Sequence, residues 1–180
     1  MFRIPIRPDF ELRLAVQSYA EPAFALIGRN REYLRRWLPW VDNTWSVEDV
    51  AQWIVRGLEQ LARNEGWHAA LWYRDQLAGF VGFKPVNWMD LRVEIGYWLG
   101  EEFQGNGLMT DAVRAATRYA FREWCLNRVE IRCAVENHRS VAIPRRLGFV
   151  QEGLLRQAFR VRDEFQDLLL FGMLREDWKP

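Results

Sequence analysis

The hydrophobic period of the chain changes near its middle, across a short segment that contains glycine. Apolar and polar residues alternate from Leu91 to Leu99, as they do in a strand with two different faces. After Gly105-Asn106-Gly107, apolar residues recur at helical spacing as far as about Trp124. A strand that runs through a glycine turn into an amphipathic helix predicts a mixed α/β structure built in layers.

The same periodicities predict the remaining elements. Strands are expected at 10–16, 67–73, 77–86, 129–135, 149–159 and 165–173, and helices at 19–37, with a break near Gly28, at 47–63 and at 140–147. With the central strand this makes seven strands and about four helices. The 180 residues include no repeat and no Gly/Ser/Pro linker, and 49% of them are hydrophobic, so we expect one domain over residues 1–180.

Charge and cysteine usage exclude several classes of function. The 25 basic and 24 acidic side chains nearly cancel and form no long run of one sign, which argues against a nucleic-acid partner or a membrane surface. No apolar run approaches the ~20 residues that cross a bilayer, so a cytoplasmic protein is expected. Cys125 and Cys133 lack the paired spacing of zinc or redox sites, and no metal is expected.

The loop before the central helix has the character of an anion site. Glycines at 105 and 107 let a ligand approach the backbone N–H groups, and the start of a helix adds partial positive charge. A pyrophosphate would suit such a loop, although Gly-x-Gly before a helix is often only a tight turn. Dinucleotide and Walker-type loops fit badly, because Thr110 occupies the place of a third glycine and no Gly-Lys-Ser/Thr occurs.

Motifs along nearly the whole chain resemble the GNAT superfamily of N-acetyltransferases, and more closely its RimJ/RimL branch of protein N-terminal acetyltransferases. The family's acetyl-CoA loop reads Gln/Arg-x-x-Gly-x-Gly/Ala. The segments that carry the resemblance are Leu34-Arg35-Arg36-Trp37-Leu38-Pro39-Trp40, Leu77-Ala78-Gly79-Phe80-Val81-Gly82, Glu94-Ile95-Gly96-Tyr97-Trp98-Leu99, Gln104-Gly105-Asn106-Gly107, Asn137-His138-Arg139-Ser140, Leu147-Gly148-Phe149 and Gln151-Glu152-Gly153.

The resemblance implies the acyl-CoA N-acyltransferase fold. In that α/β (α+β) fold, a mostly antiparallel seven-stranded sheet has splayed fourth and fifth strands, and acetyl-CoA, the cosubstrate, lies in the cleft between them. Exposed backbone there would pair with the pantetheine arm as a sheet edge accepts an added strand. The cofactor-binding residues implied are Tyr97, Trp98, Leu99, Gln104, Gly105, Asn106, Gly107, Leu108, Met109, Thr110 and Asn137.

The catalytic positions match the family's pattern only in part. Glu94 resembles the strand-four glutamate that serves as general base, directly or through water, but a carboxylate paired with Arg92 or Arg132 is an equal alternative. The family's usual acid, a tyrosine, is replaced by Pro144. Ser140 could instead protonate the CoA sulfur, or it could simply cap a helix.

Other family positions also differ. Glu102 stands where the loop's leading Gln or Arg is expected, and Phe159 where RimL-like enzymes have a glutamate. The resemblance places Trp37, Trp40 and Trp88 on the acceptor pocket, with core packing as the alternative. Arg139, Arg145 and Arg146 could reach the 3′-phosphate of CoA, or could face solvent.

Together these features predict transfer of acetyl to a primary amine, by direct attack. The leading hypothesis is the α-amine of a protein N-terminus, such as Ser or Ala of a ribosomal protein. Acetylation of a small amine, such as a polyamine, aminoglycoside or amino acid, is the first alternative, since loops set acceptor choice on a shared scaffold. A non-catalytic acyl-CoA sensor is the second, and a homodimer is plausible on the high aromatic content.

Overall fold

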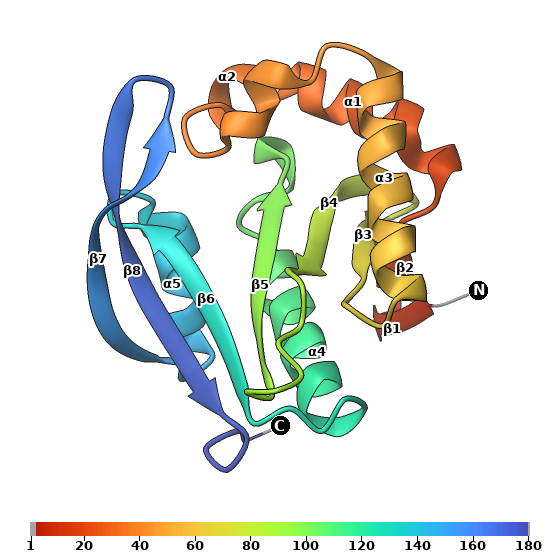
Figure 1. Cartoon of the computed structure of the whole chain (residues 1–180). Helices are drawn as coiled ribbons and strands as arrows, with labels where there is room; N and C mark the ends of the chain where they lie inside the picture. The colour runs from red at the N-terminus through yellow and green to blue at the C-terminus, as the bar shows by residue number, and fades with distance from the viewer. Residues whose placement is uncertain (1–2, 180) are drawn as a thin grey trace.

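The protein, in a computed structural model that describes residues 3–179, has an eight-stranded mixed sheet with the order β1-β2-β3-β4-β5-β6-β8-β7 (Figure 1). The strands are β1 (Arg3–Arg7), β2 (Phe10–Leu14), β3 (His68–Tyr73), β4 (Gln76–Phe83), β5 (Arg92–Leu99), β6 (Arg128–Ala134), β7 (Val150–Val161) and β8 (Glu164–Leu174). The α-helices are α1 (Ala20–Arg29), α2 (Arg31–Leu34), α3 (Val47–Ala62), α4 (Leu108–Arg122) and α5 (His138–Arg146), with 3-10 turns η1 (Gln17–Tyr19), η2 (Pro39–Asn43) and η3 (Glu101–Phe103).

The seven expected strands are all present, and the structure adds an eighth at the edge. Strand β1 pairs antiparallel with β2. Its sequence, Arg-Ile-Pro-Ile-Arg, alternates but is short and interrupted by proline, and its exposed arginines face outward. An edge strand tolerates proline because one side of its backbone needs no partner. Pattern analysis therefore missed an element that completes the sheet.

The single helix expected at 19–37 is divided at Asn30 rather than Gly28. Asn30 is buried; its amide nitrogen donates to Leu26 O over 3.0 Å, and its Oδ1 accepts from Glu101 N over 2.8 Å. This side chain thus joins the end of α1 to the loop that follows β5. Helix α2 then ends at Leu34, three residues before the expected end at Trp37, and a turn leads to Pro39, where the chain enters η2.

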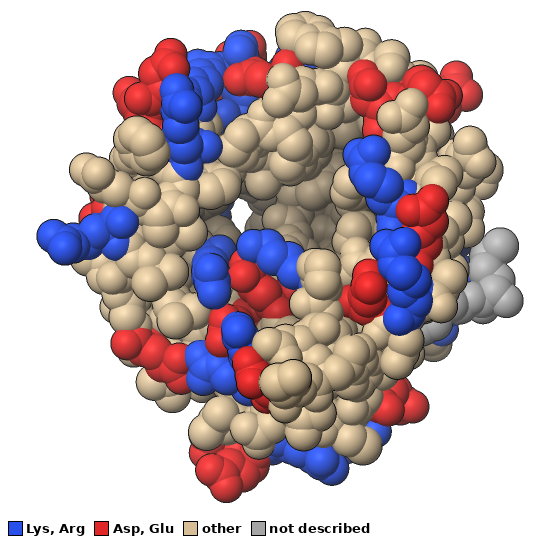
Figure 2. Space-filling model, in the orientation of Figure 1, with Lys and Arg blue, Asp and Glu red and all other residues tan. Residues whose placement is uncertain are grey.

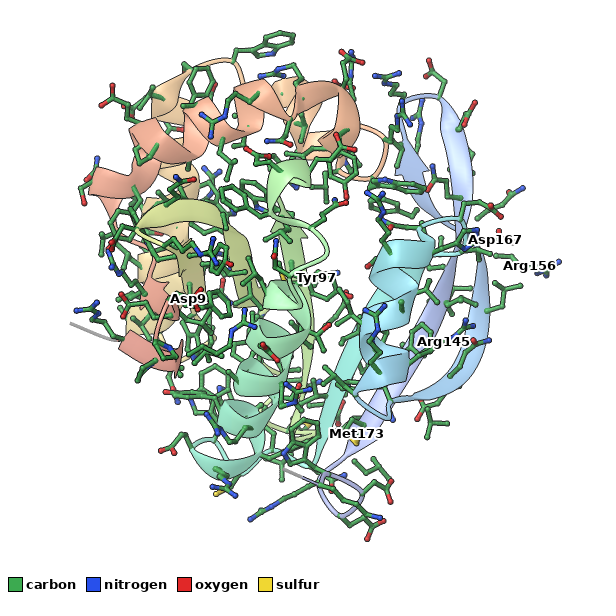
Figure 3. The ribbon with its side chains drawn as sticks, turned by 180° about the vertical axis from the view of Figure 1, so that it is seen from behind. Asp9, Tyr97, Arg145, Arg156, Asp167 and Met173 are labelled. Carbon is green, nitrogen blue, oxygen red and sulfur yellow. The ribbon has the colours of Figure 1, made fainter. Side chains whose placement is uncertain are left out.

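Helices cover both faces of the sheet. Helices α1 and α3 lie on one face, and α4 and α5 lie on the other, as the two opposite views show (Figures 1 and 3). The apolar stripe of α4, which includes Ala112, Ala116 and Ala120, is fully buried against the sheet. Small side chains let this helix approach the strands closely, so its first turn is held firmly at the end of β5.

The neighbouring parallel strands β5 and β6 pair over only three positions, Arg92 to Glu94 with Arg128 to Glu130. Beyond Glu94, β5 continues to Leu99 and keeps its antiparallel partner β4, while β6 turns toward β8. We call this divergence the β5–β6 fork. It confirms the splay predicted for the fourth and fifth of the seven expected strands, and it leaves one edge of β5 without a strand partner.

His68, at the start of β3, is packed inside the fold. Its ring stacks on Trp53 with 5.0 Å between centroids, and Cβ atoms added at Gly57 and Gly82 would lie only 2.8 and 2.3 Å from it. Glycine is therefore required at both positions by close approach. Burial lowers the pKa of His68, although a hydrogen bond with the backbone of Phe83 opposes the shift.

This burial predicts a pH-dependent stability. Because the pKa of His68 is lower in the folded chain than its unfolded value of about 6.5, the unfolded chain binds more protons below that pH. The free energy of unfolding should be unaffected above pH 6.5 and should fall below it, by at most ~1.4 kcal/mol per pH unit for one proton. His68→Phe keeps a flat ring against Trp53 and should flatten this slope in urea titrations between pH 5 and 8.

The matched control is His138→Gln, because the side chain of His138 is 81% exposed. This variant should keep the wild-type slope. An unchanged slope in His68→Phe would show that another group carries the acid sensitivity.

Candidate active site

A cavity of about 820 Å³ opens beside the fork. It is bounded by the carboxyl end of β5, the loop that leads into α4, helix α2 and the start of α5, and most of its lining is apolar. The volume suits a large, mostly extended ligand. The lining residues are Tyr33, Leu34, Trp37, Leu38, Tyr97, Trp98, Leu99, Glu101, Phe103, Gln104, Gly105, Gly107, Leu108, Met109, Thr110, Asp111, Asn137, Arg139, Ser140, Ile143 and Arg146.

The loop before α4 presents backbone donors to this cavity. Gly107 is the N-cap of α4 with φ of 72°, and Gly105 has φ of 78°, both in the left-handed region. No side chain among the described residues caps this helix. The N–H groups of its first turn, from Leu108 to Thr110, therefore point outward with the positive end of the helix dipole, which is the arrangement that binds phosphate.

Side chains from distant parts of the chain support the loop. Asn106, which does not line the cavity, turns its Nδ2 back to Phe103 O and Gln104 O, at 3.2 and 3.1 Å. Arg7, from the unexpected strand β1, donates to Asn106 O over 3.3 Å and lies 3.6 Å from Asp111 Oδ2. Arg7 partly neutralises the one carboxylate in the first turn of α4. Sequence analysis could not find this contact, because 99 residues separate Arg7 from Asn106.

Gln104 bridges two elements across the cavity. Its Nε2 donates to the hydroxyl of Tyr33 on α2, and its Oε1 accepts from Arg139 on α5. Arg146 also lines the cavity. Arg145 does not: it points to β7, where it donates to Gln151 Oε1 over 3.1 Å (Figure 3).

Glu102 turns away from the cavity. Its Oε1 lies 3.6 Å from Arg29 Nε, and its side chain is 42% exposed. The carboxylate that replaces the family's Gln or Arg therefore makes a surface ion pair. The donors that this loop offers to an anion are therefore backbone N–H groups.

Three polar side chains meet where the fork opens. Tyr97 of β5 points to the side of the sheet that carries α4 and α5 (Figure 3), and its hydroxyl lies 3.1 Å from Ser140 Oγ and 3.2 Å from Ser140 O. Ser140 Oγ also lies 3.2 Å from Cys133 Sγ of β6. No sequence pattern joins Tyr97, Cys133 and Ser140, since they come from three elements.

Ser140 is not the helix cap that the alternative interpretation expected. The N-cap of α5 is Asn137, whose Oδ1 accepts from Ser140 N over 3.1 Å. Ser140 is the third residue of α5, and its hydroxyl, which caps nothing, meets Tyr97 and Cys133 at the cavity wall. Asn137 acts both as the cap and as part of the cavity wall.

Burial keeps this cluster protonated. Burial, reinforced by the nearby Cys133, holds the pKa of Tyr97 well above its usual range. Burial also raises the pKa of the Cys133 thiol, although the hydrogen bonds with Ser140 and Tyr97 oppose the shift. A protonated thiol is a poor nucleophile, and a protonated phenol can donate one hydrogen bond while it accepts another. The Tyr97 hydroxyl does both, since it donates to Ser140 O and accepts from Ser140 Oγ.

Glu94 lies on the opposite face of the fork and does not line the cavity. We call this the front face; it carries Glu94 and Trp98 of β5 with Glu130 and Arg132 of β6. Lys84 Nζ lies 2.6 Å from Glu94 Oε1, and Arg132 Nε lies 3.3 Å from Oε2. Both oxygens of this carboxylate are thus in ion pairs. The alternative interpretation, that Glu94 pairs with Arg92 or Arg132, holds for Arg132.

The three tryptophans assigned to an acceptor pocket lie in different places. Trp37 lines the cavity. Trp40 does not, but it is 38% exposed and packs on Trp98 with 5.8 Å between ring centroids. Trp88 lies apart from both, where it packs on Trp124 and donates to Asn64 O over 2.8 Å.

Ion pairs connect the β7–β8 hairpin to η2 across the opening of the cleft on the front face. Arg162, at the tip of the β7–β8 hairpin, lies 3.3 Å from Asp42 of η2, and Asp42 also pairs with Arg35 at 2.9 Å. Figure 2 shows an opening that passes through the molecule, with basic and acidic side chains gathered along its lower rim. The cavity can therefore be reached from both sides of the sheet.

A forked sheet, a backbone anion site at a helix start and a cleft open at both ends define an acyl-CoA-dependent transferase. The model of the acetyltransferase (GNAT) domain family matches residues 9–150. The chain belongs to this family, and it is an N-acetyltransferase that uses acetyl-CoA. Within residues 3–179, no group of three or more His, Cys, Asp or Glu could hold a metal ion, and no helix could span a membrane.

Three similar proteins match this chain over nearly their whole length. YdaF of Bacillus subtilis (strain 168), provisionally named a ribosomal N-acetyltransferase, is 34% identical over 99% of this chain and 98% of its own. The ribosomal-protein-serine acetyltransferase of Escherichia coli (strain K12) is 28% identical over 95% and 96%. A structure of RimL, a ribosomal L7/L12 alpha-N-protein acetyltransferase with CoA in a disulfide to a cysteine, has a TM-score of 0.93 with 26% identity, covering 98% of this chain and 99% of RimL.

The loop geometry predicts that CoA affinity depends on Gly107. Gly107→Ala would place a side chain at φ of 72°, at a cost of about 1–2 kcal/mol, and would set a methyl group where a phosphate approaches the backbone. No protein atom lies within 4 Å of that added Cβ, so any loss reflects the backbone and the ligand. Calorimetry should show CoA affinity reduced at least about tenfold.

Gly28→Ala is the matched control. Gly28 lies within α1, and an added Cβ meets nothing within 4 Å there. The change should leave CoA affinity unaltered and raise stability by up to ~1 kcal/mol. Equal CoA affinity in both variants would remove the loop as the phosphate site.

Proposed function

We propose that this enzyme transfers acetyl from acetyl-CoA to the α-amine of a protein N-terminus, with a ribosomal protein as the natural acceptor. The observation that carries this is the two-sided cleft: backbone donors and Ser140 on one side of the fork, and a separate front opening on the other. The similarity to YdaF and to the E. coli serine acetyltransferase supports the acceptor class. An enzyme that acetylates ribosomal proteins would act in the cytoplasm.

Acetyl-CoA would enter from the side of α4 and α5. The N–H groups from Gly105 to Thr110 would bind its pyrophosphate, and Arg139 or Arg146 would reach its 3′-phosphate. The free edge of β5 at Tyr97, Trp98 and Leu99 would pair with the amides of the pantetheine arm. The sulfur would then lie near Ser140 and Cys133, which is consistent with the CoA–cysteine disulfide of RimL.

The chemistry is direct attack of the neutral amine on the thioester carbonyl. Cys133 is held as a thiol, which argues against an acetylated cysteine on the pathway. As the tetrahedral intermediate collapses, the C–S bond breaks and Ser140 Oγ–H gives its proton to the departing sulfur. In the resting enzyme Ser140 Oγ donates to the Tyr97 hydroxyl, which itself donates to Ser140 O. As the serine proton leaves, the O–H of Tyr97, which stays protonated, would turn to the serine oxygen, and solvent would then return a proton to Ser140.

Glu94 remains our proposed general base. It is the carboxylate of β5 on the front face, and its side chain is only 14% exposed. Because Lys84 and Arg132 occupy both of its oxygens, it would take the amine proton through a water molecule rather than by direct contact.

The proposed acceptor is tested with an acceptor panel. We expect CoA release from acetyl-CoA with peptides that begin with Ser or Ala, and kcat/KM at least about tenfold lower for spermidine, an aminoglycoside or a free amino acid. The same peptides with a blocked N-terminus and an internal lysine should not react. Faster turnover of a small amine would overturn the protein acceptor.

The proposed acid is tested at one hydroxyl. Ser140→Ala should lower kcat about 10²-fold or more with little change in CoA affinity, because the proton is needed only as the thiolate leaves. Ser140→Thr keeps a hydroxyl and should recover part of the rate. Equal rates in wild type and Ser140→Ala would exclude Ser140 as the acid.

A further inference from the structure

The front face of the fork carries a chain of alternating charges. Glu94 joins Lys84 and Arg132, and Arg132 Nη2 lies 3.4 Å from Glu130 Oε2. Glu130 Oε1 lies 2.8 Å from Arg128 Nε. The chain is completed by Arg92, which lies 3.8 Å from Glu130, and by Glu152, which pairs with Arg128.

The two signs are not equally accessible. The side chains of Glu94 and Glu130 are 14% and 9% exposed, whereas those of Lys84 and Arg132 are 60% and 36% exposed. The carboxylates thus lie beneath the cations. A molecule that approaches the fork from the front meets positive charge, although the protein as a whole is nearly neutral.

The outer cations keep donors that the ion pairs do not use. Glu94 takes one of the three N–H donors of Lys84, and the ion pairs of Arg132 use its Nε and Nη2. The Nη1 group of Arg132 and two protons of Lys84 remain for a ligand. These donors suit a carboxylate, which accepts several charge-assisted hydrogen bonds at once.

Apolar side chains adjoin these cations. Leu170 of β8 is directly opposite Arg132 of β6 in the antiparallel register, so both point to the front face. On the other strand of the fork, Trp98 packs on Trp40. A peptide with both apolar and acidic side chains could therefore contact apolar groups and cations at this surface.

Positive charge also discriminates among amines. It favours the neutral form of an approaching amine and repels further cations. An α-amine, with a pKa of about 7.7–8.0, is readily neutral near pH 7.5, whereas a lysine or polyamine nitrogen near 10.4 is not. The front face therefore disfavours polycations and tolerates α-amines.

On the basis of the proposed function, we propose that the acceptor is a polypeptide N-terminus followed within a few residues by an acidic side chain, which binds Lys84 and Arg132. The α-amine then reaches the thioester at the fork. The carboxylate of the acceptor contacts Lys84 and Arg132 and so fixes the direction in which the peptide binds.

The test compares Ser-led peptides that are identical except for Glu, Gln or Lys at their third and fourth positions. We expect kcat/KM to be highest for the Glu peptide, lower for the Gln peptide and lowest for the Lys peptide. The Glu and Gln peptides should differ roughly fivefold. The step should shrink at 0.5 M salt, because the Debye length falls to a few ångströms there. Equal values, or a preference for Lys, would overturn the inference.

Variants assign the effect to the two cations. Lys84→Gln and Arg132→Gln should each reduce the ratio of Glu-peptide to Gln-peptide kcat/KM toward one. The ratio is the readout because both cations also pair with Glu94, so an effect on the base changes the rate with both peptides and cancels in the ratio. Lys84 is the safer change, since its side chain is 60% exposed. Arg118→Gln on the exposed surface of α4 is the control and should keep the ratio.

The outcomes separate the two proposals. Turnover of all three peptides at one rate would reject the acidic preference and leave the N-terminal acceptor intact. Turnover of spermidine without any peptide would reject the N-terminal acceptor itself. An unchanged ratio in both Lys84→Gln and Arg132→Gln, with wild-type melting temperatures, would show that the acidic side chain binds elsewhere.

Discussion

The parting of two neighbouring parallel strands controls the rest of this structure. Strands β5 and β6 share only three paired positions, and after Glu94 the edge of β5 has no strand to bond with. Backbone polar groups that lose a partner in this way must find another, and an extended ligand is one solution. The fork also separates β5 from β6 enough for a cleft to pass from one face of the sheet to the other.

Side chains bridge the fork on both of its faces. Toward α5, Tyr97 of β5 bonds to Ser140, which in turn touches Cys133 of β6. On the front face, Glu94 of β5 pairs with Arg132 of β6. The neutral bridge lies among apolar groups and stays protonated, while the ionic bridge faces water. This difference in environment divides the cleft into a side suited to a thioester and a side suited to a polar acceptor.

The start of α4 offers backbone donors to an anion. Gly107 is the N-cap of α4, and no side chain of the described residues caps this helix, so its first N–H groups can bind a ligand. Glu102, which might have opposed an anion, is turned to Arg29, and Asp111 is paired with Arg7. Asp111 also pairs with Arg114, one turn along the same helix. Local and distant arginines together therefore compensate these two carboxylates.

The sequence by itself determined the order of the elements, the family, the glycine loop and most of the cavity wall from Tyr97 to Thr110, because these depend on local periodicity and contiguous motifs. It did not reveal strand β1, the cap at Asn137, or the place of Trp88. Only the tertiary structure decided which groups meet: Arg7 with Asn106, Tyr97 with Cys133, Lys84 with Glu94. Such contacts join strands and helices far apart in the chain, and their burial and charge balance exist only once the sheet has assembled, which no local pattern records.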